Sequence, residues 1–409
     1  ALALLEKLKE DSNLSQDLEP AVVELSHMLS KSLEMNAKAI GVILPLTGDK
    51  ASFSTRAMQG IQLALKKYWG ENTPEIFFKD SQATAGLGVQ AVKELIFKDK
   101  VSVVIGGLFP EEAKEEYLEA KKYGTLFISL APIYLPFREK DHLLIEIPGS
   151  VESQMRAFFS EKSLAYFGKK GAIFYPKDIM GEAFAETFWH YAQEKNVKLT
   201  AIGSFAKATT DYRPSIEKML GLTLPRERED EYKILQEIYS LDSQKKVNRT
   251  NILPPVLDFD WVFIPALPNE ALQIIPTFGF LDATGIKFVG IPSWRGRDME
   301  IKNHKMGQVF LVGNDSNAEE LKFQQDFIAE FKSTAKIIES LSFESFSMVY
   351  DIFSKTNIQN RDVLSQTLLQ VPTLTGLTST WRLVEGLWLK EMEILKFSAG
   401  KALPLFRAR

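Results

Sequence analysis

Residues 39–79 read AIGVILPLTGDKASFSTRAMQGIQLALKKYWGENTPEIFFK. The apolar run 39–44 ends in a small polar loop at 45–49. An amphipathic stretch at 55–69 then leads to a second strand-like run at 75–79. A strand, a helix and a second strand in this order predict a parallel βαβ unit, because the helix returns the chain to the starting edge of the sheet.

The same alternation continues along the chain. Further strand-like runs lie at 101–105, 125–130, 171–175, 198–202, 261–264, 287–290 and 308–312. Amphipathic stretches between them, the predicted helices, lie at 85–97, 111–122, 151–167, 181–195 and 270–280. About nine strands are more than one compact open sheet of this length usually carries. The sequence therefore predicts an α/β protein with two doubly wound parallel sheets.

Two segments depart from this alternation. Residues 1–36 predict a short N-terminal helical segment that Pro20 divides into two helices, too short to be stable alone. It is either an arm packed on the main body or the remnant of a removed helical-repeat domain, and we expect the chain to be part of a longer protein. The charged stretch 225–255, with a helical core at 232–239, is predicted to be a surface insertion.

Composition excludes several classes of function. The chain has 49 Lys and Arg against 53 Asp and Glu, so it lacks the basic excess of a nucleic-acid-binding protein. It has no cysteine, which excludes disulfides, thiolate metal sites and a cysteine nucleophile. No apolar run approaches the roughly 20 residues of a membrane-spanning helix. We expect no nucleic-acid partner and no membrane span.

Motifs for catalysis are also missing. The sequence contains neither a phosphate-binding loop nor a Gly-x-Ser-x-Gly motif, and its four histidines are dispersed. The acidic pairs Glu111-Glu112 and Glu115-Glu116 lie among lysines and are interpreted as a solvated helix face. We therefore predict a non-enzymatic protein with no catalytic residues, no metal and no cofactor.

Small polar loops follow four of the predicted strands, at 45–49, 80–82, 106–109 and 129–132. Such loops form turns in many proteins, but open α/β sheets bind ligands beyond the carboxyl ends of their strands. Four consecutive loops of this kind indicate a shared cleft. Trp294 and Arg295 follow the predicted strand 287–290 and are candidates to stack on or pair with a ligand.

Several of these stretches resemble a known family. They are AIGVILPLTG at 39–48, Gly60, Asp80-Ser81, VIGG at 104–107, FIS at 127–129, 173–181, VYD at 349–351 and 376–400. Their order and spacing are similar to those of type I periplasmic binding proteins of the leucine/isoleucine/valine-binding class. The resemblance extends over roughly residues 38–405.

The resemblance implies two lobes that close on a small ligand by hinge motion. The lobes are joined by a three-strand hinge, and the Pro-Gly link at 147–150 and the turn at 312–314 are natural crossings. Lobe 1 then comprises residues 38–148 plus 314–372. Lobe 2 comprises residues 149–313 plus 373–409.

The resemblance also identifies a departure in the ligand site. In amino-acid-binding members, a serine and a threonine hold the ligand carboxylate, and an aromatic and an acidic residue hold its amino group. The corresponding positions here carry Pro110, Ile133, Met180 and Pro292 or Ser293. The amino-acid clamp is therefore missing, and an ammonium group would need Asp80, Asp178 or Asp298 as a substitute partner.

A second resemblance concerns ILPP at 252–255, FDWVFIP at 259–265, IIP at 274–276 and GIPSW at 290–294. These stretches look like the branch that contains penicillin-binding-protein activator lipoproteins, which join N-terminal helical repeats to the same bilobed fold. The resemblance implies a peptidoglycan synthase as partner. It also implies a periplasmic location and a lipid anchor in the outer membrane.

The preferred interpretation is a regulatory lipoprotein of peptidoglycan synthesis with a solute-binding-protein-like domain. The alternative is a substrate-binding receptor that delivers an amino-acid-like or other small polar ligand to an ABC transporter permease. Predicted ligand-binding residues of the interlobe cleft are Thr47, Ser52, Phe53, Asp80, Ser81, Phe109, Ser129, Ala131, Tyr134, Tyr175, Met180, Leu267, Trp294 and Arg295. We further predict that Phe109, Met180 and Trp294 face one another and narrow this cleft.

Overall fold

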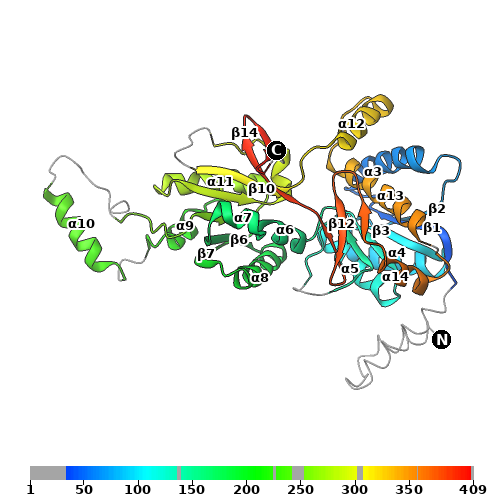
Figure 1. Cartoon of the computed structure of the whole chain (residues 1–409), viewed down its shortest axis with the longest axis horizontal. Coiled ribbons are helices and arrows are strands. Elements are labelled where there is room, and N and C mark those ends of the chain that lie inside the picture. Colours follow the sequence, from blue (N-terminus) through cyan, green and yellow to red (C-terminus); the bar gives the residue numbers. More distant parts are fainter. Residues whose placement is uncertain are drawn as a thin grey trace, which may run out of the picture. The chain divides into compact units, whose positions relative to one another are not determined.

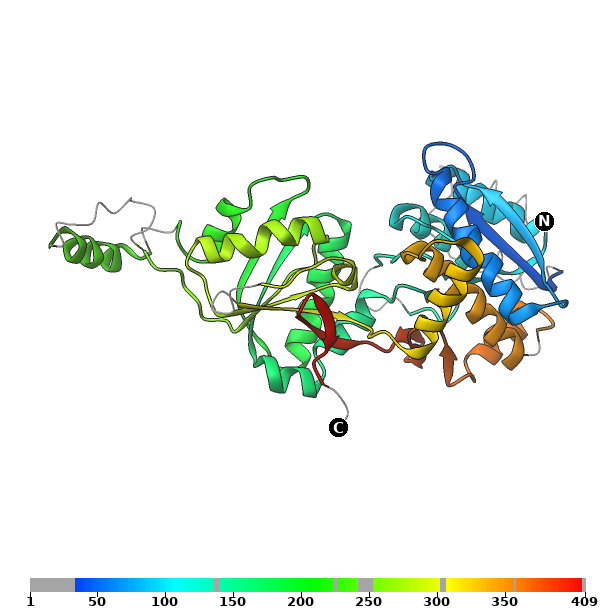
Figure 2. The same ribbon diagram turned by 90° about the horizontal axis from the view of Figure 1, so that it is seen from above.

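The computed structural model describes residues 34–135, 140–223, 227–241, 253–301, 307–356 and 358–406. The chain divides into two compact units (Figures 1 and 2). Unit 1 comprises Ala1–Ser150 and Ser316–Glu391, and unit 2 comprises Val151–Asp315 and Met392–Arg409. The chain therefore passes between the units after Ser150, after Asp315 and after Glu391.

The main sheet of unit 1 is parallel, with the strand order β2-β1-β3-β4-β5. Its strands are β1 (Asn36–Leu44), β2 (Glu75–Asp80), β3 (Val101–Gly106), β4 (Leu126–Ser129) and β5 (Leu144–Glu146). All strands run in one direction, so the loops that follow them lie at one edge of the sheet. This edge, the carboxyl edge of unit 1, carries the four polar loops singled out above.

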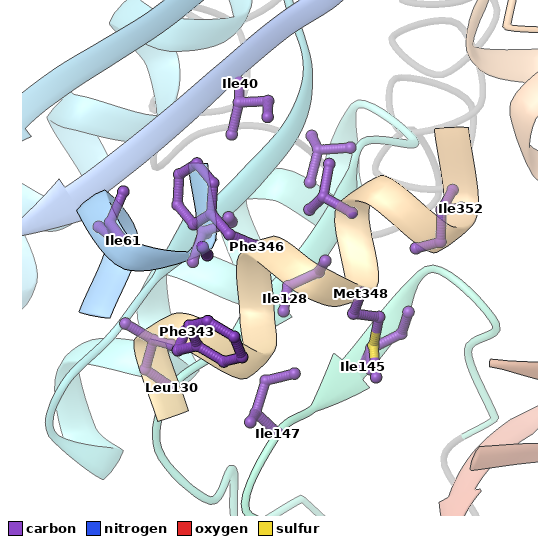
Figure 3. Close-up of a cluster of buried hydrophobic side chains, with 14 of the residues drawn as sticks. Ile40, Ile61, Ile128, Leu130, Ile145, Ile147, Phe343, Phe346, Met348 and Ile352 are labelled. Carbon is purple, nitrogen blue, oxygen red and sulfur yellow. The ribbon is translucent and has the colours of Figure 1, made fainter. Parts of the chain in front are cut away.

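Helices cover both faces of this sheet, as parallel sheets require. One face packs on α3 (Ala51–Ala64), α12 (Ala318–Phe331), α13 (Ile337–Lys355) and α14 (Arg361–Leu368). The other face packs on α4 (Ala85–Phe97) and α5 (Pro110–Lys122). Figure 3 shows the first of these cores, where Phe343 and Phe346 of α13 lie against Ile61 of α3 and the isoleucines of the strands. Helix α3 ends in the π-helical turn Leu65–Trp69.

Helices α3 and α13 approach each other closely at Gly60. A Cβ atom at this position would lie 2.2 Å from the backbone oxygen of Glu339. The Arg56 guanidinium, one turn earlier on α3, donates two hydrogen bonds of 2.7 Å to the Glu339 carboxylate. Close backbone packing and an ion pair therefore act together to fix α3 against α13.

We expect Gly60→Ala to lower the free energy of unfolding by about 1–3 kcal/mol, because the two helices must separate to admit the methyl group. Gly86→Ala in α4 is the matched control, since a Cβ atom there would meet nothing within 4 Å. Helix propensity predicts a gain of up to about 1 kcal/mol for this control. Urea unfolding of the two variants measures both effects. Equal stability of the two variants would refute the close-contact argument.

Unit 2 contains a sheet with the strand order β15-β14-β10-β9-β8-β6-β7. Strands β6 to β10 are parallel, and β14 and β15 extend the sheet as antiparallel strands. The strands are β6 (Lys170–Lys177), β7 (Lys198–Ala206), β8 (Trp261–Phe263), β9 (Ile286–Gly290), β10 (Gly307–Gly313), β14 (Glu393–Ser398) and β15 (Lys401–Pro404). The helices are α6 (Val151–Phe158), α7 (Glu161–Phe167), α8 (Ile179–Glu194), α9 (Arg213–Met219), α10 (Glu229–Leu241), α11 (Pro268–Phe280) and the short 3₁₀ helix η3 (Pro292–Gly296).

Aromatic side chains form much of the core of unit 2. The Phe158 ring lies 4.9 Å from Trp261 in an edge-to-face arrangement and 5.2 Å from Phe159, between ring centroids. Phe188 stacks on Phe263 instead, with ring centroids 5.6 Å apart. Edge-to-face pairs of this kind add about 0.5–1.5 kcal/mol each beyond the area that they bury.

The α/β class and the nine predicted strands are confirmed, and the strand bounds differ by a few residues at their ends. Strands β5, β14 and β15 and the three strands between residues 373 and 390 were not predicted, and β5 has only three residues and no alternation to detect. The sequence also predicted one helix at 151–167, where the structure has α6 and α7. The Ser160 side chain accepts a hydrogen bond from the Ser163 backbone nitrogen and starts a new helix there.

The predicted boundary of the second lobe needs a correction at 373–391. These residues form the antiparallel sheet β11 (Thr373–Thr375), β12 (Thr380–Val384) and β13 (Leu387–Lys390), which belongs to unit 1. The physical reason is burial, because Trp381 and Trp388 fill the same core as α3 and α13. Sequence alternation alone does not tell which core such a hairpin joins.

The predicted N-terminal helical segment 1–36 lies outside the described residues, except for its last three, and Asn36 already begins β1. The predicted helix within the charged insertion is confirmed as α10. In the described part of the chain, no helix combines the length and the apolar character that crossing a membrane requires.

Candidate functional site

Asp80, at the end of β2, shapes the loop that follows β1. One carboxylate oxygen accepts hydrogen bonds from the backbone nitrogens of Leu46 (2.8 Å), Thr47 (3.3 Å) and Gln82 (3.0 Å). The other accepts from the Thr47 hydroxyl. Partial burial works to raise the pKa of Asp80, but these hydrogen bonds outweigh it and hold the pKa below its ordinary value. Asp80 is thus an anion that holds a loop.

Of the three predicted serines, Ser81 and Ser129 are buried, and their hydroxyls bond to their own loops. Ser81 Oγ accepts a hydrogen bond from the Ala83 backbone nitrogen at 3.3 Å. Ser129 Oγ donates to the Ala131 carbonyl at 2.6 Å and accepts from the Ala131 nitrogen at 3.3 Å. Both side chains are fully buried, so the loops after β2 and β4 are preformed without a ligand. Tyr134, five residues after Ser129 in the sequence, is half-buried.

An aromatic pair and a cation lie at the same edge of unit 1. Phe53, in the first turn of α3, and Phe109, directly before α5, form an edge-to-face pair with centroids 5.7 Å apart. The Lys50 ammonium lies 5.8 Å from both ring centroids. Thr47 and Ser52 are exposed beside them in the sequence. In the described part of the chain Lys50 has no carboxylate partner, so its charge is available to an anion.

The interpretation of the acidic pairs on α5 as a solvated face is wrong for two of the four residues. Glu112 and Glu116 are buried, because they share the inward side of the helix with Ala113 and Tyr117. Their spacing of four residues, in register with the apolar positions, is the signal that the sequence analysis did not use. The lysines that are their neighbours in the sequence point elsewhere on the helix.

Glu146, at the end of β5, is another buried carboxyl group that was not predicted from the sequence. Its side chain is 8% exposed and accepts a hydrogen bond from the Ile133 backbone nitrogen at 2.7 Å. Burial raises the pKa of Glu146 to about 8, against the effect of this hydrogen bond. The group therefore titrates near neutral pH, close to the point where the chain leaves unit 1.

In unit 2, the predicted residues also lie near strand ends. Tyr175 is half-buried near the end of β6, and Met180 is half-buried in the first turn of α8. Leu267 precedes α11 and is exposed. Asp178 accepts a hydrogen bond from the Gly181 backbone nitrogen at 2.9 Å and caps α8. Asp298 likewise accepts from the Glu300 backbone nitrogen at 3.1 Å.

Trp294 packs inside unit 2. Its side chain is fully buried, and its indole nitrogen donates a 2.7 Å hydrogen bond to the Ala266 carbonyl. A Cβ atom at Gly290 would lie 2.2 Å from the ring, so the indole rests directly on the end of β9. The Trp294 donor and much of its ring surface are therefore used within the unit, and Arg295 beside it is half-buried.

The structure thus joins Thr47 to Asp80 in unit 1 by hydrogen bonds between neighbouring loops, with Ser81 next to Asp80 in the sequence. It brings Phe53 and Phe109 together by ring packing. Phe109 belongs to unit 1, whereas Met180 and Trp294 belong to unit 2. The narrowing of a cleft by these three side chains stays a prediction. Within the described ranges, no group of three or more His, Asp or Glu side chains is arranged to hold a metal ion.

No protein-family model matches the chain, and no curated protein matches it. Solved structures do. A branched-chain amino acid transporter substrate-binding protein of Streptococcus pneumoniae, in complex with isoleucine, is 15% identical with a TM-score of 0.57, covering 90% of this chain and 98% of the other. A solute-binding protein of an R. palustris ABC transporter, in complex with benzoate, is 16% identical with a TM-score of 0.56, covering 90% and 96%. A type 1 periplasmic binding protein of Bordetella pertussis is 12% identical with a TM-score of 0.59, covering 90% and 100%.

Proposed function

We propose that this chain, which has the type I periplasmic binding protein fold, is a solute receptor of the periplasm that works with an ABC transporter. Similar solved structures are described as complexes with isoleucine, with leucine and with benzoate. At these identities they support the fold, and the site has to support the function. The observation that carries the proposal is the aromatic and cationic cluster of Lys50, Phe53 and Phe109 at the carboxyl edge of unit 1.

This cluster favours a small carboxylate with an apolar or aromatic body. Lys50 supplies a positive charge for the carboxylate, and the two rings supply apolar surface. Helix α3 adds to this, because its first turn contains no acidic residue that would neutralise its N-terminus. The other polar side chains at this edge, Asp80 and Ser81, already accept hydrogen bonds from backbone nitrogens of the loops.

An α-ammonium group on the ligand finds no assigned partner. The three carboxylates that sequence reasoning offered for it, Asp80, Asp178 and Asp298, each accept hydrogen bonds from nearby backbone nitrogens. Enclosing an unpaired ammonium would cost several kcal/mol. We therefore expect carboxylates without an amino group to bind more tightly than the corresponding amino acids.

A thermal-shift comparison of matched ligands tests this proposal. The pairs are 3-phenylpropanoate with L-phenylalanine and 4-methylpentanoate with L-leucine, and each pair differs by the amino group alone. Ligand at 100 times its dissociation constant should stabilise the protein by about 2.7 kcal/mol. Lys50→Gln should weaken binding about tenfold, while Lys98→Gln, an exposed lysine at the end of α4, should leave it unchanged. Preference for the amino acids would refute the ligand class, and no shift with any solute would refute the receptor function.

A regulatory function in peptidoglycan synthesis, with a synthase as partner, is the second candidate. It is favoured by α10, which exposes Ile234 and Ile238 one turn apart on the same side of the helix. The buried hydroxyls of Ser81 and Ser129 support it too, since they offer little to a solute. In the experiment above, this function predicts no response to any small molecule.

A further inference from the structure

Two carboxyl groups lie buried in unit 1 without hydrogen-bond partners. Glu112 and Glu116 are one turn apart on α5, with exposed fractions of 2% and 0%. Among the described residues, none of their four carboxyl oxygens has a donor at normal hydrogen-bond geometry; the Ser81 hydroxyl and the backbone N–H groups of Phe109 and Gly107 lie nearby and act only weakly on them. Burying an ionised carboxylate without hydrogen-bond donors costs several kcal/mol. The surroundings of Glu112 and Glu116 therefore disfavour the ionised form of both groups.

Two glycines make the space that the Glu116 carboxyl occupies. A Cβ atom at Gly88 of α4 would lie 2.5 Å from Glu116 Oε1, and one at Gly106 of β3 would lie 2.4 Å from Oε2. The carboxyl group is thus pressed between a helix and the end of a strand. This fit leaves its two oxygens in contact with backbone.

The charged groups around Glu112 and Glu116 make ionisation of the pair still less favourable. Asp80, at the end of β2, carries a negative charge that disfavours ionisation of Glu112. Cations on the packed helices are used elsewhere, because Lys122 and Lys93 lie 2.6 Å and 3.8 Å from the carboxylate of Glu119. Lys79, at the neighbouring strand, pairs with Glu94 and Asp99. In the part of the chain that the structure describes, no ion pair compensates Glu112 or Glu116.

Burial is the main cause that raises the pKa of Glu112, and it outweighs the opposing effects of the Ser81 hydroxyl, the Glu116 carboxyl and the Phe109 backbone N–H. For Glu116, burial and then the neighbouring Glu112 carboxyl raise the pKa well above its ordinary value. Two neighbouring buried carboxyl groups do not both ionise readily, because their negative charges repel each other. A single proton shared between them removes this repulsion and gives both groups a hydrogen-bond interaction.

We propose that Glu112 and Glu116 form a proton-binding site, in which the folded protein keeps a shared proton at neutral pH. The site lies directly behind the loops after β2 and β3, where Ser81 and Gly107 are located. Loss of the proton places a second negative charge behind these loops and loosens them. If the proposed receptor function holds, solute binding at this edge is linked to proton binding and weakens as the pH rises.

The experiment uses the full chain and needs no ligand. The double variant Glu112→Gln/Glu116→Gln replaces both groups by isosteres of the protonated form. Glu119→Gln is the control, since Glu119 is equally buried on the same helix but is paired with lysines. Infrared difference spectra at pH 7 between wild type and each variant report the carbonyl band of a protonated carboxyl group. Because each difference is taken against wild type, the Glu146 signal cancels.

We expect the difference spectrum of the double variant to contain this band and that of Glu119→Gln to lack it. The raised pKa also determines how the stability of the folded protein changes with pH. The folded state binds the proton more tightly than the unfolded state, so wild-type stability is highest below the ordinary value of 4.5 and falls as the pH rises. Between the ordinary pKa and the raised one, unfolding releases the proton. In this pH range the equilibrium constant for folding of wild type should fall up to about tenfold per pH unit relative to the double variant.

Absence of the band, with parallel pH profiles of wild type and double variant, would overturn the proposal. Glu116→Gln alone provides the same readouts if the double variant does not fold. These outcomes are independent of solute binding, so the proton site and the receptor function fail separately. A proton site with no effect of pH on solute affinity would overturn only the linkage.

Discussion

Replacing Lys390 by methionine is expected to lower the free energy of unfolding of unit 1 by about 3–5 kcal/mol, because it leaves a buried carboxylate without its cation. Lys390 is 7% exposed and Glu344 is 3% exposed. The Lys390 ammonium lies 3.5 Å from Glu344 Oε2, donates a 2.9 Å hydrogen bond to the Ile147 carbonyl and lies 4.6 Å from the centroid of the Trp381 ring. The variant loses all three contacts at once.

The double variant Lys390→Met/Glu344→Gln separates the ion pair from packing. The substituted glutamine side chain keeps an oxygen that can accept the 2.7 Å hydrogen bond from the Leu377 backbone nitrogen, while the unpaired charge is gone. We expect this variant to regain much of the lost stability. Lys140→Met is the control, because Lys140 and Glu385 form an exposed pair that contributes less than about 1 kcal/mol. If Lys390→Met lowered the free energy of unfolding as little as Lys140→Met, the buried ion pair would not have the stabilising effect argued above.

The Lys390 network also connects the segments that leave unit 1. Ile147 precedes the first crossing, and Lys390 precedes the third. Asn317, just after the second crossing, donates a 3.0 Å hydrogen bond to the Leu377 carbonyl. One ion pair and the hydrogen bonds around it therefore hold the ends of all three crossings within unit 1.

Glu146→Gln is expected to stabilise the protein by on the order of 3–5 kcal/mol at pH 8 and above, and to leave it unchanged below about pH 4. The folded-state pKa is about 8 and the ordinary value is 4.5. Because the pKa is raised, the folded state holds the proton more tightly, and wild-type stability falls as the pH rises between these two values. Glutamine keeps the acceptor for the 2.7 Å hydrogen bond from Ile133 and has no proton to lose.

Chemical unfolding between pH 4 and pH 9 measures this effect as the difference between variant and wild type. Taking the difference removes the contribution of other groups, such as Asp80, whose lowered pKa acts in the opposite direction at acid pH. Glu71→Gln, at an exposed position of the same unit, should show a constant difference. A constant difference for Glu146→Gln as well would mean that this carboxyl is ionised in the folded protein.

The sequence predicted the scaffold better than the site, for physical reasons. Strands such as β3 are continuous apolar runs, which burial on both faces of a parallel sheet demands. The assignment of β11 to β13 failed because it depends on which core receives Trp381 and Trp388. That choice is made by packing between segments far apart in the chain.

The residue types at the strand ends predicted polar loops correctly, whereas the ligand site that these loops would form stays a prediction. Whether Ser129 or Asp80 serves a ligand or a turn depends on hydrogen bonds of the folded backbone, and here they serve the turns. Glu112 and Glu116 were misread because charge in a sequence usually means solvent, whereas the face of a helix decides burial.

Native mass spectrometry of the full chain with the matched carboxylates and amino acids tests the receptor function most directly. The account predicts one bound carboxylate per chain, a clear preference for 3-phenylpropanoate over L-phenylalanine, and reduced occupancy in Lys50→Gln. Chains that stay free of every solute, in wild type and variant alike, would contradict the receptor function and leave a protein partner as the better explanation of this fold.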